Sequence, residues 1–388
     1  MKTNLALIAS ALLLGATIVA QAPPVPGDVL PGMTPREFEE FRIGLEDFRE
    51  IEEASEGLGP LFNGTGCAAC HNVPVIGGGS PMTEMRAGTR DADGTFRVVG
   101  GTTLYQMFSI PDHRCQSAVP SDATIVARRM SIPLFGAGLI EAVADETLLA
   151  LEDPFDRDRD GISGRAAVIT DVATGQRRIG RFGWKAQVAT LLTFSGDAYT
   201  NEMGITNDIF PHEAYGGISE ARMRECDRVS DPEDRVDPRT GKRAIDNFEA
   251  FMKFLAPLAR GPITDDVRAG EQVFGALGCS SCHVPALSTN ANAIASLNRK
   301  TVPLFSDLLL HDIGTGDGIA QEAAQPAEIR TPALWGLRFR RPLLHDGSAM
   351  TPSDAINRHS GEAAGVMENY RRATDQMRRA LFAFLDSL

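Results

Sequence analysis

Apolar residues recur at helical spacing in three parts of the chain. In residues 244–256, Phe248 and Phe251 fall on one face of a helix. Residues 369–388 repeat apolar positions in the same way. Residues 34–56 begin with a Thr-Pro pair and continue with many acidic residues, which is typical of a helix start. We therefore expect one helix over each of these three segments.

Breaks between these segments divide the chain. Pro and Gly-Pro breaks follow residues 244–256, and Thr264 with two aspartates after it then marks the start of another helix. We place a domain boundary there, between an N-terminal unit (21–260) with inserted segments and a C-terminal unit (261–388). Residues 72–127 are rich in Gly, Pro, Asp and Thr, which predicts loops and short strands. The expected fold class is mainly α, with long loops and few strands.

Composition narrows the class of protein. The 388 residues include 43% hydrophobic and 23% charged residues, enough for a buried core and too apolar for a disordered chain. Acidic residues outnumber basic ones by 51 to 38, which gives a net charge of −13. Nucleic acid is excluded as an expected partner, because no cationic surplus is available to neutralise phosphates.

The first 20 residues have the pattern of a secretory signal. One lysine precedes an apolar run and a group of small residues, and cleavage fits after Ala20 or Ala22. An uncleaved anchor helix is the alternative. No later segment reaches the roughly 20 apolar residues of a membrane span, so we expect a mature chain without one. Export implies a periplasmic, oxidising location.

Four of the six cysteines form two copies of one motif. The CxxCH pattern occurs as Cys67, Cys70 and His71, and again as Cys279, Cys282 and His283. Two thiols at this spacing can each bond one vinyl group of a porphyrin, and the adjoining histidine then becomes an iron ligand. A thioredoxin-like redox pair does not require the histidine, and a zinc site of four thiolates leaves both histidines without a role. The motifs therefore predict two covalently bound haem c groups.

The residues before each motif match as well. A phenylalanine stands five positions before the first cysteine of each motif, and a glycine stands directly before that cysteine. In a cytochrome c the aromatic packs on the haem edge and the glycine permits a tight turn. The expected architecture is two cytochrome c-like haem domains.

The two remaining cysteines are Cys115 and Cys226. They are either two free thiols or one disulfide, and an oxidising compartment favours the disulfide.

An acidic repeat at residues 156–161 has the alternation of a calcium loop. Asp156, Asp158 and Asp160 are followed by Gly161, so three carboxylates can converge on one hard cation. Ala167 stands where an EF-hand has glutamate, which excludes a complete EF-hand. A calcium site and a plain acidic turn both fit the pattern.

Several longer motifs together resemble one family. They are LFNGTGCAACH, GRFGWKAQVATL, TNEMG, GCSSCH, SDLLLHDIG, RTPALWGL, and LLHDGSAMT followed by HSGEA. They cover nearly all of the mature chain, which resembles the bacterial di-haem cytochrome c peroxidase and MauG superfamily, and its di-haem oxidoreductase branch in particular.

The resemblance implies roles for three further residues. Trp184 corresponds to a tryptophan between the two haems, and Glu202 to an acid on the distal side of the peroxide-binding haem. Peroxidases of this superfamily carry an axial methionine fourteen residues after the histidine of their HDG motif, and here that count from His345 reaches His359. The resemblance therefore implies a C-terminal haem with two histidine ligands and a lowered reduction potential.

The function implied is that of an exported di-haem oxidoreductase. It would reduce hydrogen peroxide with electrons from a small redox protein or another donor, and the N-terminal haem would be the reactive one. One alternative is a di-haem electron carrier without catalysis. Another is an oxygenase or maturation enzyme that acts on a large substrate.

Overall fold

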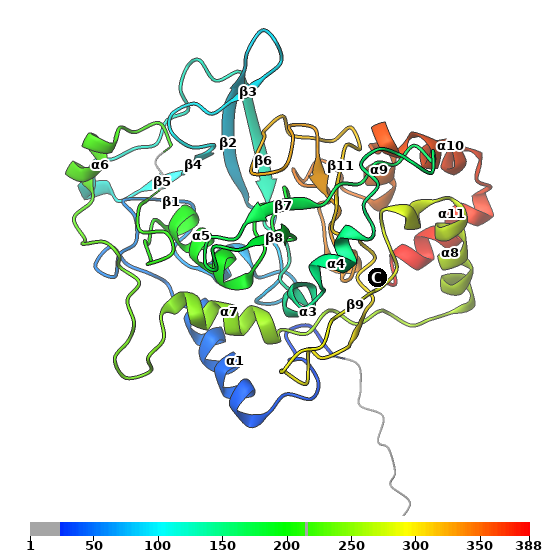
Figure 1. Cartoon of the computed structure of the whole chain (residues 1–388), viewed down its shortest axis with the longest axis horizontal. Coiled ribbons are helices and arrows are strands. Elements are labelled where there is room, and N and C mark those ends of the chain that lie inside the picture. Colours follow the sequence, from blue (N-terminus) through cyan, green and yellow to red (C-terminus); the bar gives the residue numbers. More distant parts are fainter. Residues whose placement is uncertain (1–23, 214–215) are drawn as a thin grey trace, which may run out of the picture.

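The computed structural model describes residues 24–213 and 216–388 (Figure 1). The α-helices are α1 (Pro35–Phe48), α2 (Cys67–Cys70), α3 (Ala137–Glu141), α4 (Asp145–Leu149), α5 (Leu191–Met203), α6 (Glu220–Cys226), α7 (Ala244–Phe254), α8 (Asp265–Ala276), α9 (Pro352–Asn357), α10 (Ala364–Arg372) and α11 (Asp375–Leu385). The strands are β1 (Leu61–Phe62), β2 (Thr83–Arg90), β3 (Phe96–Arg97), β4 (Leu104–Tyr105), β5 (Phe108–Ser109), β6 (Ile125–Met130), β7 (Ala167–Thr170), β8 (Arg177–Gly180), β9 (Leu287–Ser288), β10 (Thr301–Val302), β11 (Leu310–His311) and β12 (Ile329–Arg330). The expected signal segment lies outside the described residues.

Helix α1 packs against α7, as its apolar face predicts. Its start is closed by a capping box, in which the hydroxyl of Thr34 accepts from the backbone of Glu37. The helix ends at Phe48, eight residues before the expected end at 56, and its Phe48 ring lies 4.6 Å from that of Phe251 in α7. A side chain at Gly44 would collide with the α7 backbone, so glycine allows the two helices to approach closely.

The single helix expected over residues 369–388 is wrong. The chain forms α10 and α11 instead, and the hydroxyl of Thr374 caps the second helix by accepting from the Met377 backbone. A capping threonine marks the start of a new helix. The apolar residues nevertheless keep their helical spacing across this threonine, so the break is not visible in the apolar pattern. Helix α11 packs on α8, where the rings of Phe274 and Phe384 lie 5.1 Å apart.

The expected mainly α fold class is also wrong. Helices make up 30% of the chain and strands 14%. The longest ladder pairs β2 with β6 in antiparallel register, from Thr83 opposite Met130 to Gly88 opposite Ile125, and β3 and β4 also pair with β2 (Figure 1). The two long strands are separated by glycine-rich sequence, so their pairing is a long-range contact that local composition does not reveal.

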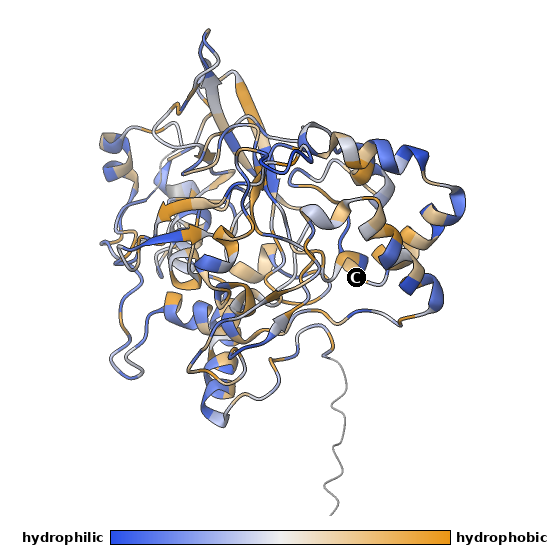
Figure 2. Ribbon diagram, turned by 45° about the vertical axis from the view of Figure 1, so that its right-hand side comes forward, coloured by the Kyte–Doolittle hydropathy of each residue, from blue (hydrophilic) through white to orange (hydrophobic). Residues whose placement is uncertain are grey.

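Two apolar cores lie under these elements. The larger one is formed by α1, α3, α5 and α7 together with residues between 287 and 309, and the smaller one lies among α8, α10 and α11. In Figure 2 the helices carry both hydrophilic and hydrophobic residues, as helices packed on one side do. The domain boundary at 260 stays a prediction. Within the described ranges, no helix is both long enough and apolar enough to cross a membrane.

The disulfide between Cys115 and Cys226 is confirmed. Their Cα atoms lie 5.8 Å apart, and both side chains are buried in a small apolar cluster with Met223. The bond connects the loop after β5 to helix α6. The disulfide therefore holds the loop after β5 and helix α6 together.

Candidate active site

Helix α2 is a single turn that presents the first CxxCH motif to a cavity of about 180 Å³, here called the N-terminal cavity. The free thiols of Cys67 and Cys70 line it together with His71. The Nδ1–H of His71 donates to the carbonyl of Gly78 at 2.9 Å, so Nε2 remains available to a metal. A Cβ on Gly78 would collide with the carbonyl of Val73, so this loop requires glycine to bring its carbonyl to the imidazole.

The second motif opens onto a separate cavity, also of about 180 Å³, here called the C-terminal cavity. Cys279 and Cys282 follow α8 and are likewise free thiols on the cavity wall. The Nδ1–H of His283 donates to the carbonyl of Phe305 at 3.1 Å, which again leaves Nε2 without a backbone partner. Both motif histidines are thus held in the tautomer that a metal ligand needs.

The structure places His359 in the C-terminal cavity, which His283 also lines. Its Nδ1–H donates to the carbonyl of Ala355 at 2.8 Å, so its Nε2 is also left for another partner. Burial, followed by the neighbouring His359, lowers the pKa of His283 to about 4. Three histidines whose pKa is lowered by burial line this cavity, namely His283, His345 and His359, and the first and last of them are the expected pair of ligands.

Trp184 lines both cavities and is buried. Its indole N–H donates to the carbonyl of Met130 at 2.8 Å, and its own carbonyl accepts from the Arg330 backbone at 2.8 Å. The guanidinium of Arg340 lies 5.3 Å from the indole centre, and the His345 ring lies 6.2 Å away at a steep angle. The sequence-predicted tryptophan is thus positioned between the two predicted sites.

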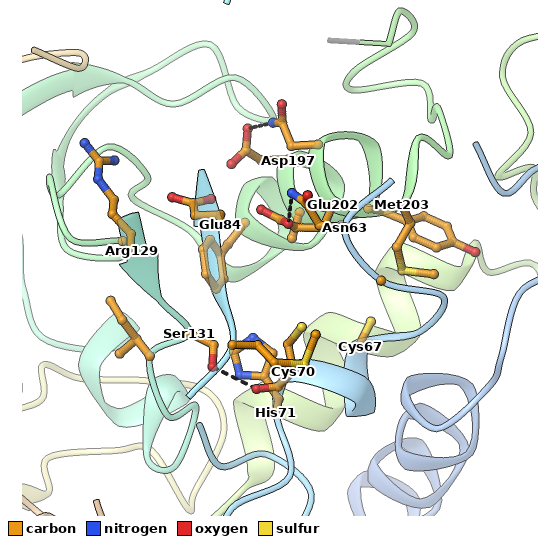
Figure 3. Close-up of a pocket in the computed structure, with 18 of the residues that line it drawn as sticks. Asn63, Cys67, Cys70, His71, Glu84, Arg129, Ser131, Asp197, Glu202 and Met203 are labelled. Carbon is orange, nitrogen blue, oxygen red and sulfur yellow. Dashed lines mark hydrogen bonds between the residues drawn. The ribbon is translucent and has the colours of Figure 1, made fainter. Parts of the chain in front are cut away.

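Glu202 projects from α5 into the N-terminal cavity. Figure 3 shows it with Glu84 at the end of the cavity away from Cys70 and His71. The side-chain amide of Asn63 donates to Glu202 Oε2 at 2.8 Å. Burial, followed by the adjacent charge of Glu84, raises the pKa of Glu202 to about 8. Glu202 therefore holds a proton more readily than an ordinary carboxyl group does.

Several charged residues of this cavity were missed by sequence reasoning. Glu84 and Arg86 stand two apart on β2, and Arg129 comes from β6 and Asp197 from α5. Alternate residues of a strand face the same side, so the Glu-x-Arg spacing would have indicated a shared face had residues 83–90 been identified as a strand.

His311, within the SDLLLHDIG motif, is held between two carboxylates. Its Nε2 lies 2.8 Å from Asp307 and its Nδ1 2.8 Å from Glu362. Burial works against the charged form, but these two acids and Cys282 raise the pKa of His311 to about 12. His311 is therefore stabilised in its imidazolium form beside the second cysteine motif, with its Nδ1 3.7 Å from the sulfur of Cys282.

The acidic repeat does bring its three carboxylates together. Oxygen atoms of Asp156, Asp158 and Asp160 all lie within 4.8 Å of one another. Each of these groups also accepts a backbone N–H: Asp156 from Gly161 at 3.1 Å, Asp158 from Asp160 at 3.3 Å and Asp160 from Ile162 at 2.8 Å. Such bonds stabilise an acidic turn without an ion, so calcium binding stays a prediction.

The residues of both cavities fit haem. Protein interiors are close-packed, with few voids larger than a water molecule, so two cavities of this size are built for bound groups. Burial raises the pKa of Cys67 to about 12 and those of Cys70 and Cys279 to about 11.

Several solved structures are similar to this chain at low sequence identity. One is the diheme peroxidase BthA from Burkholderia thailandensis, at 15% identity and a TM-score of 0.42, covering 94% of each chain. A hydrazine synthase from Kuenenia stuttgartiensis matches at 14% identity and a TM-score of 0.39, covering 99% of this chain and 100% of that one. A MauG-like protein associated with microbial copper homeostasis matches at 16% identity and 0.33, covering 72% and 94%.

No curated protein matches this sequence. The sequence profile of one family, described as "Di-haem oxidoreductase, putative peroxidase", matches residues 95–388. This match covers more than half of the chain and includes the second CxxCH motif, Trp184 and Glu202. The chain therefore belongs to the di-haem oxidoreductase family, in which two haem groups are the cofactors.

Proposed function

We propose that this protein is an exported c-type di-haem peroxidase that reduces hydrogen peroxide to water with electrons from a small redox protein or another small donor. The reaction consumes one peroxide, two protons and two electrons, and releases two water molecules. Haem, when bound, would supply the redox chemistry by holding electrons and binding the oxidant. The signal-like pattern of residues 1–20 supports export to the periplasm.

The two cavities supply a complete set of groups for covalent haem attachment. Cys67 and Cys70 would bond the vinyl groups of one haem and Cys279 and Cys282 those of the other. His71 and His283 would be iron ligands through Nε2, because their Nδ1 atoms are already bonded to backbone carbonyls. His359 would be the second ligand in the C-terminal cavity.

The position of Glu202 in the cavity of the first CxxCH motif is the observation that carries this proposal. A general acid must hold a proton at the working pH and lie within reach of the reacting atoms. Glu202 is buried in the same cavity as the first CxxCH motif, and Asn63 fixes one of its oxygens. We infer that its other oxygen delivers a proton to the peroxide oxygen that leaves as water.

Reactivity is assigned to the N-terminal cavity because of its lining. His71 is the one histidine among the described residues that surround it. From the sequence, only histidines were considered as further iron ligands. Five methionines also line the cavity: Met82, Met107, Met130, Met203 and Met252. A thioether is a haem ligand in some cytochromes, so an open coordination site has to be tested against methionine as well.

The test starts with protein matured in a host that assembles cytochromes c. Mass spectrometry should show two haem additions to the mature chain, and one addition would overturn the assignment. Absorption and EPR spectra recorded with peroxide and with dioxygen should then show reaction of one haem. Failure of the reduced protein to bind carbon monoxide or peroxide would favour the electron carrier. An oxidised state that small donors do not reduce would favour an enzyme with a large substrate.

A further inference from the structure

Two partly buried carboxyl groups meet in the N-terminal cavity, one more than a single proton donor requires. Glu202 comes from α5 and Glu84 from β2, and Figure 3 shows the two side chains next to each other. They are close enough to hydrogen-bond directly. Two ionised carboxylates repel each other strongly at this separation in a buried site, so the pair retains one proton at neutral pH.

The neighbours of the pair determine which carboxyl group carries that proton. Arg86 binds both oxygens of Glu84, through Nε at 2.6 Å and Nη2 at 3.1 Å. Burial works to raise the pKa of Glu84, but the charge and hydrogen bonds of Arg86 outweigh it and leave the pKa below its usual value. No cation binds Glu202 in this way, and its one side-chain amide partner is Asn63. The proton therefore resides on Glu202, whose O–H donates to Glu84.

The other charged groups around the pair do not compete for this proton. Arg129 of β6 contributes positive charge near Glu84 and is itself bound to Asp317 at 2.6 Å. Asp197 of α5 accepts from Asn201 at 2.8 Å, and burial raises its pKa to about 6. Asp197 thus remains mostly ionised at neutral pH, when Glu202 is protonated.

We propose that Glu84 is a positioning residue for Glu202: it accepts a hydrogen bond from the Glu202 carboxyl group and favours the reprotonation of that group after each proton transfer. This inference rests on the proposed peroxide chemistry. Glu202 gives one proton to the departing oxygen, and the second proton of the reaction comes from solvent. Once Glu202 is ionised, two adjacent carboxylates attract a new proton more strongly than one.

The pairing can be tested by infrared titration of the haem-loaded protein. The carbonyl stretch of a protonated carboxyl identifies Glu202, because Glu202→Gln removes it. Glu84→Gln removes the neighbouring charge and leaves Arg86 without its acid, so the midpoint of the Glu202 band should fall by about two pH units. The protonated fraction at pH 7 then falls from about nine-tenths to about one-tenth. Asp197→Asn is the matched control, since it removes a cavity carboxyl that does not bind Glu202 and should leave the transition in place.

The pH profile of peroxide turnover separates this role from a structural one. At neutral pH Glu84→Gln should be slower by about tenfold, in line with the lost protonated fraction. Its rate should recover at acidic pH, where Glu202 is protonated again. Glu202→Gln should be slower by about 100-fold or more at every pH, because no carboxyl is left to donate.

The outcomes distinguish the pairing from the proposed function. Peroxide turnover with an unchanged Glu202 transition in Glu84→Gln would overturn the pairing and leave the peroxidase intact. A shifted transition in a wild-type protein that does not turn over peroxide would support the shared proton and overturn its catalytic use. A slower Glu84→Gln that acid does not rescue would assign Glu84 a packing role only, against our proposal.

Discussion

Replacement of Asp317 should destabilise the junction that holds Trp184. The carboxylate of Asp317 lies 2.6 Å from Arg129 and 3.1 Å from Lys185, and all three side chains are at most 2% exposed. Arg129 directly precedes Met130, the acceptor of the indole N–H, and Lys185 directly follows Trp184. Asp317→Asn preserves the shape of this side chain and removes its charge, which leaves two buried cations without their acid.

The expected loss of stability is large. Removal of one partner from a buried ion pair lowers the free energy of unfolding by about 3–5 kcal/mol. With an unfolding entropy of about 2 cal/mol/K per residue, a chain of this length should lose about 4–6 °C in Tm.

The loss should also depend on pH in a defined direction. Burial lowers the pKa of Lys185 to about 8 even with Asp317 present, from its usual value of 10.5. Without Asp317 the folded-state pKa falls further, so the folded variant releases this proton at a lower pH than the unfolded chain does. Stability rises with pH wherever the unfolded state binds more protons. The difference in the free energy of unfolding between the variant and the wild type should therefore become smaller between about pH 6 and about pH 9. It should not disappear, because Arg129 stays charged over this range.

Thermal unfolding of the haem-loaded proteins, followed by circular dichroism at both pH values, measures this effect. The control is Glu368→Gln, which removes the acid of an exposed ion pair with Arg372 on α10. An exposed pair contributes about 1 kcal/mol or less, so this variant should unfold close to the wild type. If the Tm of Asp317→Asn decreases no more than that of the control, the reasoning about buried charge is refuted. If the Tm of Asp317→Asn decreases equally at both pH values, Lys185 is not the group that makes the loss of stability depend on pH.

Three further changes test separate parts of the site. Trp184→Phe should slow electron transfer between the haems in stopped-flow experiments while both haem spectra stay unchanged; an unaltered rate would make Trp184 a packing residue. His359→Met should convert a bis-histidine spectrum to a histidine–methionine spectrum and raise that haem's potential, and unchanged spectra would contradict the alignment that selected His359. His311→Gln leaves Asp307 and Glu362 without their cation and should lower the free energy of unfolding by about 3–5 kcal/mol in denaturant titrations. The wild-type contribution of His311 is fully present below about pH 6.5 and is lost as pH rises through its folded-state pKa of about 12, so a stability difference that grows above about pH 7 would contradict this assignment.

Local signals in the sequence predicted the helices better than the sheet. Thr34 and Thr264 cap α1 and α8 as expected, because a cap depends on residues within one turn. The β2–β6 ladder depends on residues some forty positions apart, and its strands lie in a segment whose glycines and aspartates indicate loops. The helix pair α10 and α11 was read as one element because apolar spacing runs through the Thr374 cap.

The same distinction applies to the site. CxxCH is a local motif, so its cysteines and histidines could be identified from spacing alone. Trp184, Glu202 and His359 required the family resemblance, since each acts with residues far away in the chain. Glu84 had neither signal, because it enters the cavity only where β2 and α5, which are far apart in the sequence, come together. Long-range pairing, not residue type, determined what sequence reasoning missed.

The two cavities differ in charge in a way that divides the reaction between them. None of the described residues that line the C-terminal cavity is acidic, and burial lowers the pKa of both Arg330 and Arg340 to about 10. Two guanidinium groups without an acidic partner match the two carboxylates of a haem and would be neutralised by them. The N-terminal cavity instead has carboxyl groups of its own, including the protonated Glu202. The first arrangement favours storage of an electron without proton uptake, and the second couples electron arrival to proton transfer. Under the proposed function, Trp184, which lines both cavities, would be the point where electrons pass from the C-terminal site to the N-terminal site.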